Sequence, residues 1–70
     1  MLDEPNIRNK LTDILSKRHF GFRSINTYKI ESSDNNSTTY TVKFKEVVMG
    51  VSGTDVDEVT LNDETGKEIN

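Results

Sequence analysis

The spacing of apolar residues changes from a helical to a strand period near residues 19–22, and this change constrains the fold more than any other feature of the sequence. Before it, Ile7, Leu11, Ile14 and Leu15 follow the i, i+4, i+7, i+8 spacing of one helix face. After it, apolar and polar residues alternate, which is typical of strands with one buried side. The change predicts an N-terminal amphipathic helix followed by a sheet.

Both ends of the predicted helix carry local signals. Asp3 or Glu4 before Pro5 is a start signal, because a carboxylate satisfies the free N–H groups of the first turn and proline tolerates that turn. Gly21 is expected to end the helix in a left-handed conformation. Cations that the negative end of the helix dipole attracts fill the last turn: Lys17, Arg18 and His19. We therefore expect a helix over about residues 4–19.

The rest of the chain predicts strands joined by hairpins. Alternation is clearest where Tyr40, Val42 and Phe44 point one way and threonine and lysine the other. Strands are expected over about residues 22–31, 38–49 and 56–62, and a short fourth strand over 67–69 is an alternative to a frayed terminus. The flexible segment from Gly50 to Asp55 should connect the second and third strands. The fold class is thus α+β: one N-terminal amphipathic helix packed on a three-stranded antiparallel sheet, or a four-stranded one, in the order α-β-β-β.

The first two predicted strands have a preferred register. Pairing Ile30 with Tyr40 and Tyr28 with Val42 places all four side chains on one face, whereas a slip of one residue does not. That face should receive the apolar stripe of the helix. Phe20 and Phe22 are expected to close the core beside it.

The apolar parity shifts after Phe44. Val47, Met49 and Val51 are apolar on what had been the outer face of the strand. Either a β-bulge near Lys45 and Glu46 returns them to the core, or a continuous strand leaves an exposed apolar patch. The second alternative predicts a partner or dimer surface.

Composition limits the function classes. Seventy residues form one domain, residues 1–70, with a small core, and the absence of cysteine excludes disulfides and thiolate catalysis. Self-association as a homodimer is one way to compensate for a small core. No apolar run approaches the roughly 20 residues of a membrane span, so we expect no membrane association and a cytoplasmic protein.

Charge divides the chain into two unlike parts. Residues 1–45 carry eight basic and five acidic side chains, a net charge of +3, and residues 46–70 carry one basic and seven acidic, a net charge of −6. The basic part suggests a nucleic-acid contact through Lys17, Arg18 and Arg23. The acidic part suggests a partner surface that combines the apolar residues above with carboxylates, namely Val47, Met49, Val51, Asp55, Asp57 and Glu58.

No enzymatic motif is present in the sequence. His19 is the only histidine, and its place at a helix end has a structural explanation in the helix dipole. Counting an EF-hand loop from Asp55 puts Thr60 where glycine is required and Gly66 where a bidentate glutamate belongs. We therefore expect no catalytic residues, no cofactor and no metal site.

The function expected by elimination is a small non-enzymatic protein-interaction or accessory module, such as a regulatory protein of a bacterium or virus. Two alternatives remain at this level. One is a nucleic-acid-binding module that uses the basic patch at the end of the helix. The other is an acidic mimic of nucleic acid that binds a basic protein through its second half, including Asp63 and Glu64.

Overall fold

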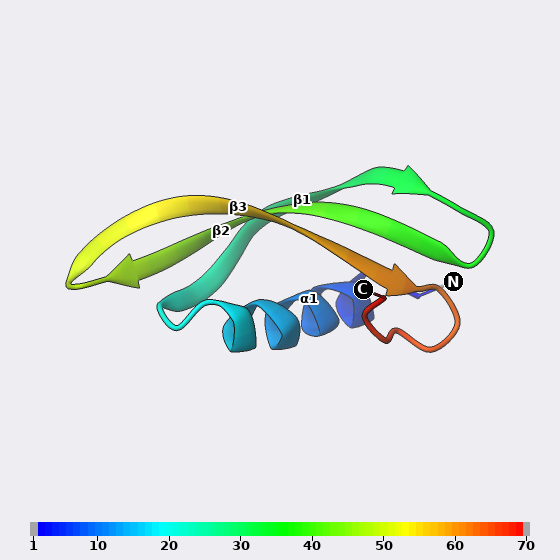
Figure 1. The fold of residues 1–70 in the computed structure, drawn as a ribbon, viewed down its shortest axis with the longest axis horizontal. Helices are drawn as coiled ribbons and strands as arrows, with labels where there is room; N and C mark the ends of the chain where they lie inside the picture. The colour runs from blue at the N-terminus through cyan, green and yellow to red at the C-terminus, as the bar shows by residue number, and fades with distance from the viewer. Residues whose placement is uncertain (1, 70) are drawn as a thin grey trace.

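A computed structural model describes residues 2–69 and shows one helix lying against one face of a three-stranded sheet (Figure 1). The elements are α1 (Glu4–Arg18), β1 (Phe22–Ser33), β2 (Ser37–Val48) and β3 (Val51–Asn62). The strands are antiparallel to their neighbours in the order β1-β2-β3. The predicted α+β class and the order α-β-β-β are confirmed. The helix α1 is neither long nor apolar enough to cross a membrane.

The helix begins and packs as its sequence predicts. The Asp3 carboxylate accepts a hydrogen bond from the Asn6 backbone N–H at 3.1 Å, which caps the first turn. Leu11 and Leu15 are fully buried, and the other two members of the stripe, Ile7 and Ile14, are partly buried against the core. We call the side of the sheet that receives this stripe the inner face and the opposite side the outer face.

The central strand β2 supplies most of the core. Tyr40, Val42 and Phe44 are buried on the inner face, together with Val59 and Leu61 of β3. The predicted pairs Ile30–Tyr40 and Tyr28–Val42 are present in the register. The expected burial of Ile30 is wrong, because this residue lies on the edge strand β1 with an exposed fraction of 56%.

Three β-bulges interrupt β1, while β2 opposite remains regular. The extra residues, read from the shifts in register, are Arg23, Asn26 and Glu31. Because each bulge restarts the alternation, the partly buried residues Phe22, Ile25 and Tyr28 recur at intervals of three rather than two. The register shift beside Lys45 and Glu46 therefore comes from β1, and the predicted alternative of a bulge in β2 is wrong.

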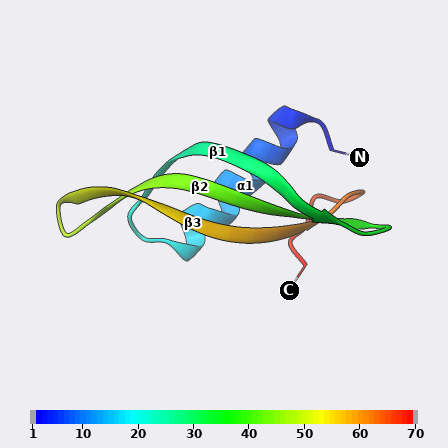
Figure 2. The same ribbon diagram turned by 90° about the horizontal axis from the view of Figure 1, so that it is seen from above.

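The hairpin of β2 and β3 is longer than predicted. Its strands pair without interruption from Ser37–Asn62 to Val48–Val51, so β3 begins at Val51 and not near residue 56. Met49 and Gly50 form the whole turn, with φ of 51° and 78°. Two left-handed residues match the twist of a tight hairpin, which is why no flexible connection forms. The turn projects past the end of α1 in both views (Figures 1 and 2).

Gly21 has a different role from the predicted one. The helix ends at His19 in an extended conformation, and the left-handed glycines of the described chain are Gly50 and Gly66. A Cβ atom on Gly21 would lie 2.1 Å from the backbone oxygen of Val47. The glycine is thus required by the close approach of β2 and not by a positive φ.

The prediction that Phe20 enters the core is also wrong, because Phe20 is fully exposed. The ring of His19 packs on the buried Phe44 instead, with centroids 4.7 Å apart and ring planes tilted by 45°. Phe22 of β1 is partly buried, as expected, and its ring centroid lies 5.7 Å from that of Phe44. At the other end of the chain, the alternative fourth strand is reduced to a single bridge between Leu61 and Glu68.

Candidate functional site at the hairpin end

The inner face of the sheet changes from apolar to acidic where the core ends. Along β3, the alternation that buries Leu61 and Val59 continues with Asp57 and Asp55. Asp55 pairs with Phe44 across the ladder, and Glu46 is the next residue on that side of β2. Three carboxylates therefore occupy positions that would extend the core if they were apolar.

Two cations from the end of α1 meet the Asp57 carboxylate. Arg18 Nη1 lies 3.2 Å from Asp57 Oδ2 and also donates to the Glu58 backbone oxygen at 3.0 Å. A second nitrogen of Arg18 pairs with Glu68. Burial raises the pKa of Asp57, but hydrogen bonds from His19, the Glu58 backbone N–H and Arg18, with the charge of Arg18, outweigh it and leave the pKa lowered. Asp57 is therefore ionised at neutral pH.

His19 is held by its backbone, its ring and one of its nitrogens. Its backbone N–H donates to the Leu15 backbone oxygen at 2.8 Å, and its ring packs against that of Phe44. His19 Nε2 lies 2.8 Å from Asp57 Oδ2. Because an ionised carboxylate only accepts hydrogen bonds, Nε2 carries the proton in this contact. In the neutral imidazole, Nδ1 then keeps a free lone pair.

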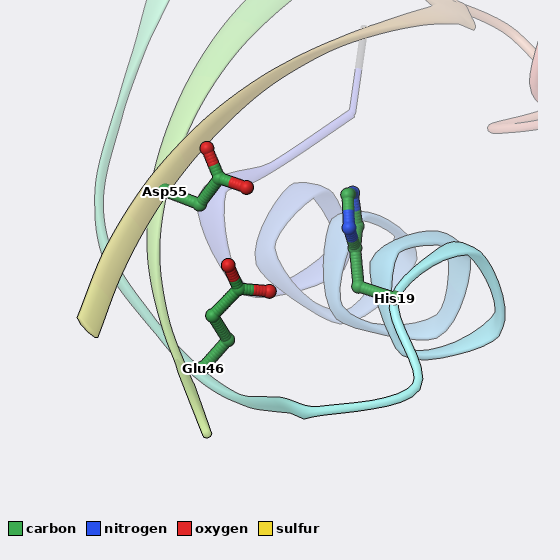
Figure 3. Close-up of side chains that lie close together, drawn as sticks. All are labelled: His19, Glu46 and Asp55. Atoms are coloured by element: carbon green, nitrogen blue, oxygen red, sulfur yellow. The ribbon is translucent and has the colours of Figure 1, made fainter. Parts of the chain in front are cut away.

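His19, Glu46 and Asp55 form a cluster around one small space. One potential ligand atom from each residue lies within 4.8 Å of the other two. Figure 3 shows the imidazole from the end of α1 and the two carboxylates from β2 and β3 gathered on the same side of the sheet. None of the four ion pairs within residues 2–69 includes Glu46 or Asp55. The cluster thus combines one fixed imidazole with two carboxylates that have no cationic partner there.

An open groove of about 470 Å³ adjoins this cluster, and we call it the tip groove. Its lining residues are Arg18, His19, Phe20, Gly21, Glu46, Val47, Val48 and Met49. Phe20 and Met49 are fully exposed, Val48 is more than half exposed, and Val51 is exposed beside Val48 in the ladder. The tip groove therefore places apolar side chains in water next to the Glu46 carboxylate, which belongs to none of the ion pairs within residues 2–69.

The residues of the predicted basic patch have different surroundings. Lys17 pairs with Asp13 at 3.3 Å on an exposed helix face, and Arg18 is engaged by Asp57 and Glu68. Arg23 is an exposed bulge residue of β1. The charge of Arg18 is therefore paired with carboxylates of the same chain.

The residues of the predicted partner surface fall on both faces of the sheet. Val51 and Asp55 share the inner face with Asp57, which is half-buried. Val47 and Glu58 belong to the outer face, and Met49 forms the turn. Sequence reasoning did not select Phe20, Val48, His19 or Glu46 for this surface. The inward parity of Glu46, two residues after Phe44, was the available signal.

In the described part of the chain, residues 2–69, no helix covers the outer face of the sheet, and this face is mostly polar. A groove of about 390 Å³ on it is lined by Thr27, Tyr28, Lys29, Thr41, Lys43 and Val56.

Comparison with known proteins does not assign the chain to a family: no family model, no curated protein and no solved structure matches it.

Proposed function

We propose that the chain is a small protein-interaction module that binds its partner through the tip groove. The observation that carries the proposal is the exposed apolar group of Phe20, Val48, Met49 and Val51 at one end of the molecule. Interfaces are anchored by a few aromatic and long aliphatic side chains that become desolvated on binding. Apolar side chains gathered in this way mark an interaction surface.

The conformation of Met49 supports the same conclusion. Methionine is held at φ 51°, in the left-handed region that asparagine and glycine favour at this position of a hairpin turn. A left-handed non-glycine residue costs about 1–2 kcal/mol, and the fully exposed side chain gains nothing from packing in return. A residue that is costly to the fold and exposed to solvent is explained by contact with a partner.

Charge selects the class of partner. Residues 46–70 have a net charge of −6, and Glu46 lines the tip groove itself. The complementary occupant is a protein segment with an apolar side chain flanked by lysine or arginine. A second copy of this chain is less favoured, because two-fold pairing through the tip groove would bring the carboxylates of both copies together.

A nucleic acid has less support as the partner. Arg18, the central residue of the predicted basic patch, already has two carboxylate partners. The acidic second half would in addition repel phosphates. The expectations of a non-enzymatic role and a cytoplasmic location remain predictions from the sequence.

Selection of random displayed peptides on the immobilised protein in EDTA tests the proposal. The selected sequences should pair an aromatic or aliphatic residue with lysine or arginine. Their affinity should fall at least about tenfold in Phe20→Ser and Met49→Asn, the loss expected for an interface hot spot. Met49→Asn should at the same time stabilise the fold by about 1 kcal/mol, because asparagine tolerates the left-handed turn. Loss of binding in this variant therefore cannot result from unfolding.

Val56→Ser is the matched control, because Val56 is an exposed apolar residue of β3 on the outer face. It should leave peptide affinity unchanged. The proposal is contradicted if no peptide is selected, if affinity is equal in Val56→Ser and Phe20→Ser, or if sedimentation gives a dimer that Met49→Asn dissociates. Binding of DNA or RNA at low salt that Lys17→Glu or Arg23→Glu abolishes would instead support the nucleic-acid alternative.

A further inference from the structure

We propose that His19, Glu46 and Asp55 form a site for one divalent transition-metal ion, with Zn²⁺ as the natural probe. One imidazole nitrogen and two carboxylate oxygens are ligands that Zn²⁺ accepts, at about 2.0–2.2 Å from the metal. Three protein ligands leave a fourth position for water or for a donor group from outside the chain. This inference does not rest on the proposed interaction role, although both involve Glu46 in the tip groove.

The three ligands come from three separate elements. His19 ends α1, Glu46 belongs to β2 and Asp55 belongs to β3. Their potential ligand atoms lie within 4.8 Å of one another, whereas a tetrahedral zinc site holds its ligand atoms about 3.4 Å apart. The long side chain of Glu46 and the exposed side chain of Asp55 can close this difference by rotation about their side-chain bonds.

Asp57 orients the imidazole for this purpose. Its carboxylate lies 2.8 Å from His19 Nε2, which leaves Nδ1 as the nitrogen with a lone pair for the metal. A histidine that binds a metal through one nitrogen and donates its other N–H to a carboxylate is the usual arrangement in metal sites. Asp57 is therefore a positioning residue and not a ligand.

The electrostatic environment favours a cation. Glu46 and Asp55 lie close together, and neither belongs to an ion pair within residues 2–69. Arg18, which lines the tip groove together with His19 and Glu46, pairs with Asp57 and Glu68 instead. Because two neighbouring carboxylates repel each other, a cation between them would replace repulsion by attraction. His19 and Glu46 also line the open tip groove, which gives an ion access from solvent.

Isothermal titration of the tag-free, EDTA-stripped chain with ZnCl₂ at neutral pH tests the site. One ion should bind per chain. Glu46→Gln, Asp55→Asn and His19→Gln should each abolish measurable binding, and Asp57→Asn should weaken it by about 10–100-fold while leaving the stoichiometry unchanged. Addition of Zn²⁺ should also shift the His19 imidazole resonances in the NMR spectrum of the wild-type chain.

Glu58→Gln is the matched control. It removes one negative charge from the same strand as Asp55→Asn but on the outer face, so Zn²⁺ affinity should not change. Circular dichroism of each variant shows whether the fold is retained. The proposal is overturned if the wild-type chain does not bind Zn²⁺, or if folded Glu46→Gln and Asp55→Asn bind it as well as Glu58→Gln does. The peptide selection above is done in EDTA, so failure of either proposal leaves the other intact.

Discussion

Replacing Gly21 by alanine tests how the helix is joined to the sheet. The added Cβ atom would lie 2.1 Å from the Val47 oxygen and 2.9 Å from its carbonyl carbon, both in the backbone of β2. Such a contact cannot be relieved by a side-chain rotation, so the start of β1 must move away from β2. This movement breaks the hydrogen bond from the Val47 N–H to the Gly21 oxygen, which is 2.9 Å long.

The expected loss of stability follows from three terms. Steric strain of this kind costs about 1–3 kcal/mol, and loss of the hydrogen bond about 1 kcal/mol. Alanine returns about 0.4–1 kcal/mol by restricting the unfolded chain. The net loss for Gly21→Ala is therefore about 1–3.5 kcal/mol, against a total stability of about 4–10 kcal/mol for a chain of this length. The melting temperature should fall by roughly 4–28 °C.

Urea denaturation followed by circular dichroism measures this loss, and two further variants identify its cause. Gly53→Ala is the control, because a Cβ atom there meets nothing within 4 Å, and it should be neutral or slightly stabilising. Gly21→Asn shows whether glycine is needed because the β2 backbone lies close to it or because residue 21 must be left-handed. Asparagine tolerates positive φ but still carries a Cβ atom. The reasoning is refuted if Gly21→Ala matches Gly53→Ala, or if Gly21→Asn is as stable as the wild-type chain.

The remaining predictions concern burial and pH. Leu15→Ala, at a fully buried position, should cost about 2–5 kcal/mol in urea denaturation, whereas Ile30→Ala should cost less than about 1 kcal/mol; equal losses would contradict the packing described. Phe20→Ser should change stability by less than about 0.5 kcal/mol and Phe22→Ser by clearly more, and the reverse order would place Phe20 in the core. Burial raises the pKa of Tyr40, with a further contribution from the charge of Asp63. Its neutral form therefore stabilises the fold fully below the unfolded pKa near 10, and this contribution is lost as the pH rises through the folded pKa. Stability measured between about pH 9 and 11 should thus fall less steeply in Tyr40→Phe than in the wild-type chain.

The sequence predicted the parts of the fold whose signal lies within one segment. The stripe ending at Leu15 and the alternation from Tyr40 to Phe44 each define a single apolar face, so element type and register follow from them. The bulges of β1 could not be predicted in this way. Their extra residues, such as Asn26, are polar side chains on an edge strand, where an unpaired residue is hydrated at little cost.

The candidate site depends on contacts between distant segments, which periodicity does not reveal. Phe20 and His19 are neighbours in sequence, and only the path of the chain after α1 decides which ring meets Phe44. The tight turn at Met49 was missed because methionine is a rare residue at positive φ. With a flexible connection expected there instead, the unbroken pairing that carries Asp55 onto the inner face was not foreseen.

The position of Glu46 distinguishes a metal site from simple protection of the sheet edge. Inward-pointing charges on an edge strand discourage pairing with other chains, and this explains Asp55 and Asp57 on β3. Glu46 belongs to the central strand, where Phe22 of β1 and Gly53 of β3 pair with it on its two sides, so it has no edge to protect. Glu46 thus interrupts the apolar pattern on the inner face of β2. It does so beside a second carboxylate and an oriented imidazole. Such local departures are expected at functional sites, and a bound cation accounts for this one.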